Sequence, residues 1–126
     1  MPGARRLFVA LEPTDPVRRR LGAIASDLKR SAGRAAEEVR WVQPDNVHLT
    51  LQFLGAVPEE RVAEVGEAVR AAAAASRTLS LEVKGAGAFP NARRPRVVWV
   101  GVAGDVPALA ELVHDLGRRL APLGPA

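Results

Sequence analysis

His48 and Thr50 stand two positions apart in the stretch DNVHLTLQFLG, Asp45 to Gly55. The segment alternates polar and apolar residues, which is typical of a half-buried strand. On a strand, this spacing places an imidazole and a hydroxyl on one face, roughly 6 to 7 Å apart, a separation that a phosphate group can bridge. Imidazole exchanges protons near neutral pH, and a hydroxyl can donate a hydrogen bond to a phosphoryl oxygen. The pair therefore predicts half of an acid–base site for a phosphate ester.

A simpler interpretation treats both residues as ordinary members of a solvated strand face, since threonine favours strands. Three details favour chemistry instead. The two side chains share a face, that face has no Lys or Glu, and Asp45-Asn46 predicts a tight turn just before His48. The alternation predicts two faces, one with His48, Thr50 and Gln52 and the other with Leu49, Leu51 and Phe53.

The first half of the chain must supply the elements that position this pair. A strand is predicted over 6–11, followed by a helix that Thr14 caps and Gly33 ends. A short strand over 39–42 and the strand 48–54, which stops at the next glycine, complete this half. The apolar stripe of the predicted helix consists of Val17, Leu21, Ile24, Ala25 and Leu28.

The second half begins with a helix over 58–75, whose inner residues are Val62, Val65 and Val69. A half-exposed strand over 79–84, a glycine-rich loop over 85–96 and a central strand over 97–102 are expected next. A third helix follows Asp105, with an apolar stripe of Leu109, Leu112, Val113, Leu116 and Leu120. This order predicts one α+β domain, residues 1–126, with helices packed on mostly antiparallel sheet.

Composition excludes several classes of protein. The 126 residues contain no cysteine, which excludes a disulfide scaffold, zinc–thiolate sites and thiol catalysis, and fits a reducing compartment. No stretch is long and apolar enough to span a bilayer, and the short run after Arg5-Arg6 is too brief for a signal peptide. We therefore expect a cytoplasmic protein with no membrane partner. The net charge of +4, with sixteen arginines and two lysines, fits phosphate recognition or a biased genome composition.

The predicted loop offers further candidates for contact with a ligand. Arg93, Arg94 and Arg96 form either a solvated loop or a patch that contacts the phosphates of an RNA backbone, and both interpretations stay open. Phe89 could stack on a base. Trp99 lies in an apolar strand, which favours a place in the core.

The chain resembles a known family along nearly its whole length. The motifs that carry the resemblance are RLFVALEP, VRWVQPDNVHLTLQFLG, VPEERV and GAFPNARRPRVVWVGV. They resemble the 2H phosphoesterases and, among them, the RNA 2',3'-cyclic phosphodiesterases, also called 2'-5' RNA ligase-like proteins. The resemblance implies two lobes with antiparallel sheets and outer helices, each lobe contributing one H-x-T-x motif.

For this sequence, the resemblance implies specific roles for the first motif. His48 would donate a proton to the leaving 3' oxygen as water opens a 2',3'-cyclic phosphate, and Thr50 would hold the phosphate. The product would be a 2'-phosphate at an RNA end. The resemblance implies no metal and no other cofactor.

The second H-x-T-x motif, which the family pattern places after the third helix, is missing from these 126 residues. His114 does not replace it, because it stands in VHDLG and helical spacing turns it away from the predicted apolar stripe. Three explanations stay open: a truncated chain, which we favour, a degenerate relative that binds RNA ends, or a second copy that supplies the partner group.

We therefore expect an incomplete second lobe. The complete protein should be monomeric, whereas this chain would expose an unpaired sheet edge and could self-associate. Two functions rival the enzyme: binding of RNA ends without catalysis, and a role as a structural or interaction fragment.

Overall fold

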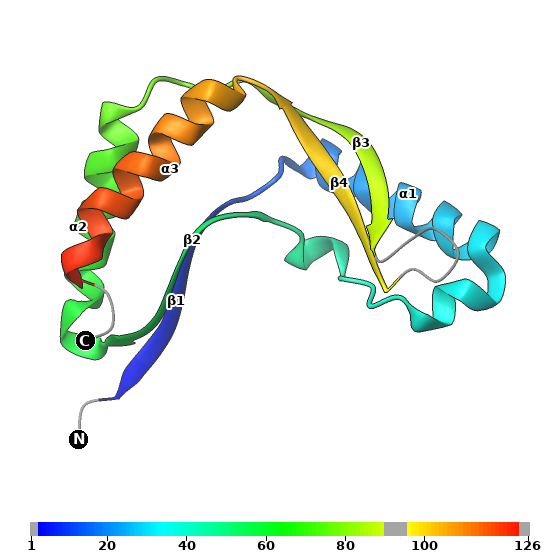
Figure 1. The fold of residues 1–126 in the computed structure, drawn as a ribbon, viewed down its shortest axis with the longest axis horizontal. Helices are drawn as coiled ribbons and strands as arrows, with labels where there is room; N and C mark the ends of the chain where they lie inside the picture. Colours follow the sequence, from blue (N-terminus) through cyan, green and yellow to red (C-terminus); the bar gives the residue numbers. More distant parts are fainter. Residues whose placement is uncertain (1–2, 90–95, 124–126) are drawn as a thin grey trace. The chain divides into compact units, whose positions relative to one another are not determined.

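The structure is a computed structural model that describes residues 3–89 and 96–123. Three helices and two antiparallel two-stranded sheets confirm the predicted α+β class. No helix in these two ranges is long and apolar enough to cross a membrane. The elements, in chain order, are β1 (Ala4–Leu11), α1 (Asp15–Ala32), β2 (Leu49–Pro58), α2 (Val62–Ala75), β3 (Leu81–Phe89), β4 (Val97–Gly104) and α3 (Val106–Leu120) (Figure 1).

The chain divides into two compact units, each built from separate segments. Unit 1 contains the described residues of 1–11, 49–81 and 104–126, and therefore holds β1, β2, α2 and α3. Unit 2 contains the described residues of 12–48 and 82–103, with α1 and most of β3 and β4.

The core of unit 1 lies between its two helices and one face of the β1–β2 sheet. α2 and α3 lie side by side (Figure 1). The small side chain of Ala72 is fully buried, which lets α3 approach α2 closely. Val57 and Leu116 are the largest side chains that are completely enclosed. The buried core consists of Leu54, Val57, Val65, Ala72, Leu116 and Leu120.

β2 pairs with β1 along its whole length but contains an irregularity at Leu54. Leu7 pairs with Gly55, whereas the next residue, Phe8, pairs with Phe53, so Leu54 is an extra residue on β2. Gly55 has a φ of 71°, a conformation that glycine adopts readily. The prediction that Gly55 ends the strand is therefore wrong. The glycine adopts the backbone conformation needed next to the extra residue Leu54, and β2 continues to Pro58.

A second irregularity changes which side chains share a face. Val9 pairs with Gln52 and Ala10 with Thr50, so Leu51 is also an extra residue. Residues that face each other across two strands point to the same side, and side chains alternate along β1. Thr50 and Gln52 consequently point to opposite faces of the sheet. The predicted common face for these two residues is wrong, because one extra residue reverses the alternation.

The same effect reverses the prediction for Phe53. The strict alternation placed Phe53 on the buried face, but its side chain is 81% exposed, whereas Leu54 is only 7% exposed. Each extra residue turns the following side chains to the other face of the sheet.

In unit 2, α1 begins and ends at the predicted residues. Thr14 is its N-cap and Gly33, with a φ of 58°, is its C-cap. No residue of α1 is buried, and Ile24 and Leu28 are exposed by more than a third. The predicted stripe is thus only partly covered among the described residues.

The segment 39–42 does not form the predicted strand. It runs between two short 3-10 helices, Gly33–Glu38 and Pro44–Asn46. Among the residues that the structure describes, its one backbone hydrogen bond outside local turns joins the Arg40 N–H to the Arg96 carbonyl oxygen at 3.0 Å. A single bond makes no ladder, so the segment stays irregular although Val39 is buried.

β3 continues through the segment that was predicted to be a loop. Its last residue is Phe89. The glycines of this segment do not break the strand but allow neighbouring groups to lie close to its backbone. A Cβ on Gly87 would lie 2.2 Å from the Trp99 ring, so the ring occupies the space above the glycine. In the described part of the chain β4 pairs only with β3, and Trp99 is 51% exposed. The predictions of a central strand and of a core tryptophan are therefore wrong here.

α3 has the predicted bounds and orientation. Leu116 and Leu120 are buried, and Leu109, Leu112 and Val113 are half-buried. His114 is exposed, as helical spacing predicted.

Candidate active site

His48 lies immediately before β2, directly after a turn that holds its ring. The Asn46 N–H donates to the Gln43 carbonyl oxygen at 2.8 Å, which closes the turn. The His48 Nδ1 atom lies 2.8 Å from the Asn46 carbonyl oxygen. A carbonyl oxygen can only accept a hydrogen bond, so Nδ1 carries the proton. The exposed imidazole is therefore oriented by its own backbone through Nδ1.

Thr50 is the second residue of β2 and belongs to unit 1. It pairs with Ala10 and is half-buried. Its side chain shares the sheet face of Ala10 and Phe8, opposite the face that packs on α2 and α3. This orientation places the hydroxyl on the face opposite to the one that α2 and α3 cover.

The boundary between the two units falls between His48 and Leu49. The two residues of the motif therefore belong to different units. Their action as a pair, with His48 as the proton donor and Thr50 as the donor of a hydrogen bond to the phosphate, stays a prediction.

The other predicted site residues are largely beyond what the structure describes. Arg96 is exposed, and its backbone carbonyl accepts the bond from Arg40. Arg93, Arg94 and the side chain of Phe89 lie outside the described residues. Their roles in binding RNA stay predictions.

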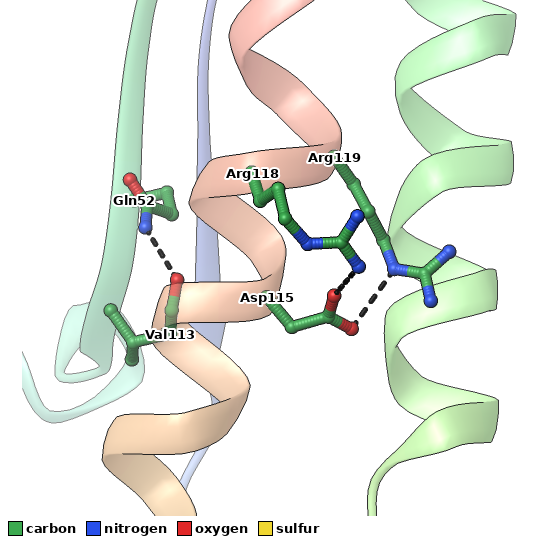
Figure 2. Close-up of polar contacts among 5 residues, drawn as sticks. All are labelled: Gln52, Val113, Asp115, Arg118 and Arg119. Carbon is green, nitrogen blue, oxygen red and sulfur yellow. Dashed lines mark hydrogen bonds and ion pairs between the residues drawn. The ribbon is translucent and has the colours of Figure 1, made fainter.

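Gln52 has a role that the sequence did not predict. Its side-chain Nε2 donates to the Val113 carbonyl oxygen of α3 at 2.8 Å (Figure 2). A Cβ on Gly117 would lie only 3.0 Å from the same nitrogen, so the glycine makes room for the amide. The contact ties β2 to α3 three residues before Gly55, between the two irregularities of the strand. A glutamine in an alternating strand gives no sequence signal for such a bond.

An aromatic pair lies on the uncovered face of the same sheet. The ring centroids of Phe8 and Phe53 are 6.3 Å apart with an interplanar angle of 43°. The two residues are 51% and 81% exposed, respectively. Sequence reasoning missed this pair because the extra residues of β2 turn Phe53 away from the core.

A cluster of three charged side chains lies on α3. Asp115 accepts hydrogen bonds from Arg119 Nε at 2.9 Å and from Arg118 at 2.6 Å (Figure 2). The bond from Arg119, aided by the one from Arg118, lowers the pKa of Asp115 against an opposing effect of desolvation. This cluster lies in the last turns of α3, apart in sequence from His48 and Thr50.

Within 3–89 and 96–123, no group of three or more His, Cys, Asp or Glu side chains could hold a metal ion. The prediction that the reaction needs no metal is not tested by this finding.

Comparison with known proteins identifies the family to which the chain belongs. The family model of LigT-like phosphoesterases matches residues 11–99, which include β2 and the H-x-T-x motif. The chain therefore belongs to the LigT-like phosphoesterases of the 2H superfamily, as the sequence motifs predicted.

Curated relatives share this chain's sequence over most of its length. A protein named RNA 2',3'-cyclic phosphodiesterase from Archaeoglobus fulgidus is 38% identical over 117 residues, covering 91% of this chain and 62% of the relative. A protein of the same name from Aquifex aeolicus is 38% identical over 85 residues, covering 68% of this chain and 45% of the relative. The chain thus spans less than two thirds of the length of these relatives.

A solved structure shares the fold. The crystal structure of E. coli LigT complexed with phosphate matches with a TM-score of 0.70 and 27% identity. The match covers 98% of this chain and 68% of the E. coli chain.

Proposed function

We propose that this chain carries the proton-donor half of an RNA 2',3'-cyclic phosphodiesterase, which hydrolyses a 2',3'-cyclic phosphate at an RNA end to a 2'-phosphate. The observation that carries the proposal is the His48 imidazole, whose Nδ1 is held by the Asn46 carbonyl oxygen directly before the strand of Thr50. The names of the relatives and the phosphate complex of E. coli LigT support the choice of substrate.

In the proposed reaction, the oxygen of a water molecule attacks phosphorus and the bond from phosphorus to the 3' oxygen breaks. The Nε2 proton of a cationic His48 passes to that 3' oxygen, which leaves as a hydroxyl. Thr50 donates a hydrogen bond to a phosphoryl oxygen, where negative charge builds up. The phosphate remains on the 2' oxygen.

The attacking water must also lose a proton to a base. In the family pattern a second H-x-T-x motif supplies that base, and residues 1–126 contain only the first. His114 is exposed on α3 and has no threonine two positions later. The second candidate function is the binding of RNA ends without turnover.

Phosphorus NMR on a 2',3'-cyclic dinucleotide distinguishes the two candidates. The enzyme predicts a resonance of a 2'-phosphate that grows with time and grows more slowly with Thr50→Val. A shifted cyclic-phosphate resonance without turnover would support the binding protein. No shift and no product would contradict both functions.

We also propose that residues 1–126 fold as one domain, in the cytoplasm, because the two units are built from interleaved segments and the sequence has no cysteine. In the described residues both sheets have two strands, so every strand has an unpaired edge. We therefore expect self-association of this chain, whereas the complete protein would be monomeric. Sedimentation velocity over a range of concentrations tests this, and a monomer throughout would contradict it.

A further inference from the structure

The segment that leads to His48 has no regular structure of its own. Residues 39–43 run between the two short 3-10 helices of unit 2 and belong to no strand in the described part of the chain. The start of the segment is held, because Val39 is buried and the following residue bonds to the Arg96 carbonyl oxygen. Its other end continues into the turn whose Asn46 carbonyl oxygen contacts the His48 ring.

Trp41 holds the segment just before that turn. Its indole Nε1–H donates a hydrogen bond to the Ala36 carbonyl oxygen at 2.9 Å. The Lys29 Nζ atom of α1 lies 5.1 Å from the centroid of the same ring, which is close enough for a cation–π interaction. The half-buried ring is thus held by a carbonyl of the 3-10 helix Gly33–Glu38 and by a cation of α1.

The side chains that follow Trp41 are held less firmly. Val42 is 57% exposed. α1 runs close to the turn as well, but the described side chains of the turn, Gln43, Asp45 and Asn46, are exposed. On the N-terminal side, the orientation of the turn therefore depends on where the indole of Trp41 is held.

We propose that Trp41 is a positioning residue, which through its bond to the Ala36 carbonyl oxygen holds the turn that orients the His48 imidazole; this inference rests on the proposed function. The bond from the Asn46 N–H to the Gln43 carbonyl oxygen closes the turn, and the closed turn directs the Asn46 carbonyl oxygen to Nδ1 of the ring. Without the indole bond the segment gains conformational freedom, the turn opens more often, and the imidazole loses its fixed tautomer. The rate of the proposed reaction then falls with the fraction of correctly oriented rings.

Nitrogen NMR on the 15N-labelled chain tests this role, because the 15N shifts of a neutral imidazole report which nitrogen carries the proton. The spectra are recorded at about pH 8.5, where imidazoles are ordinarily neutral. Trp41→Phe keeps an aromatic ring but removes the indole donor, and should move the His48 shifts toward those of an unrestrained imidazole. Trp99→Phe is the matched control, because it changes the chain's other tryptophan, which is 51% exposed on β4, and should leave the His48 shifts unchanged. Unchanged His48 shifts in Trp41→Phe would overturn the proposal.

A second measurement needs no variant at position 41 and decides the matter if Trp41→Phe does not fold. In wild type, the indole N–H of Trp41 should exchange with solvent roughly 2- to 10-fold more slowly than that of Trp99, the protection that one hydrogen bond provides. Trp99→Phe assigns the two indole signals. Equal exchange rates would overturn the proposal, because they would show that the indole bond is absent.

The kinetics of hydrolysis separate this inference from the proposed function. Trp41→Phe should lower kcat for a 2',3'-cyclic dinucleotide by roughly 2- to 10-fold and leave KM unchanged, because Thr50 holds the phosphate in the proposed reaction. If wild type hydrolyses the dinucleotide and Trp41→Phe changes neither kcat nor the His48 shifts, the proposed function stands and the positioning role is wrong. If Trp41→Phe releases the imidazole but wild type forms no 2'-phosphate, the positioning of the ring stands and the proposed hydrolysis is wrong.

Discussion

The Nε2 atom of Gln52 in β2 lies 2.8 Å from the Val113 carbonyl oxygen in α3 (Figure 2). Gln52 lies between two extra residues, Leu51 and Leu54, and points to the opposite face from Thr50. The bond therefore connects β2 to α3. It lies next to the extra residue Leu51, which places Thr50 on the opposite face of the sheet.

Removing this side chain should destabilise unit 1. Gln52→Ala deletes a half-buried side chain and its hydrogen bond, and we expect the free energy of unfolding to fall by about 1 to 2 kcal/mol. Gln43→Ala is the matched control, because Gln43 is exposed, and it should change stability by less than about 0.5 kcal/mol. Urea denaturation measures both variants, and equal stabilities would show that the bond contributes nothing.

Gly117 should be energetically coupled to Gln52. A Cβ at position 117 would lie 3.0 Å from the Gln52 Nε2 atom, so Gly117→Ala forces the amide to move. Alanine in a helix also adds up to about 1 kcal/mol over glycine. We therefore expect Gly117→Ala to stabilise the Gln52→Ala variant more than the wild type. A double-mutant cycle measures the difference, and additive effects would contradict the coupling.

Leu116 should be a principal source of stability for unit 1. Its side chain is 2% exposed between the helices and the sheet, and Leu116→Ala should cost about 2 to 5 kcal/mol. Leu28→Ala on α1 is a control with the same chemistry at an exposed position, and should cost much less. Similar losses for the two variants would mean that the core does not lie where the structure places it.

Acid should weaken α3 through Asp115. Because the Arg119 and Arg118 bonds lower the pKa of Asp115 in the folded chain, the carboxylate stabilises the fold above its ordinary pKa of 3.8. That contribution to stability is lost as the pH falls through the lowered pKa of Asp115. The difference in melting temperature between wild type and Asp115→Asn should therefore be largest above about pH 4, shrink below it, and decrease in 1 M salt. A difference that does not vary with pH would contradict this account.

The helices could be predicted from the sequence because their signals are local. Thr14 and Gly33 delimit α1. The apolar stripe at helical spacing predicted which face of α3 is buried, and with it that His114 is exposed. The turn before His48 was also predicted from Asp45-Asn46, and the structure has a 3-10 helix there.

The strands were predicted less well because their register depends on the partner strand. Nothing local in β2 marks Leu51 and Leu54 as extra residues, yet they decide that Gln52 faces α3 and Phe53 faces outward. The glycines of β3 likewise resemble a loop until the Trp99 ring is placed over Gly87. Partner-dependent geometry of this kind concealed both the Gln52 anchor and the aromatic pair.

The central claim is that His48 transfers a proton to the leaving oxygen, and its most direct test is the rate at which the chain converts a 2',3'-cyclic dinucleotide to the 2'-phosphate. His48→Ala should lower this rate by roughly 100- to 10,000-fold, the usual contribution of a general acid. His114→Ala, which removes the chain's other histidine from an exposed position on α3, should leave it unchanged. Equal rates for wild type and His48→Ala would contradict the account.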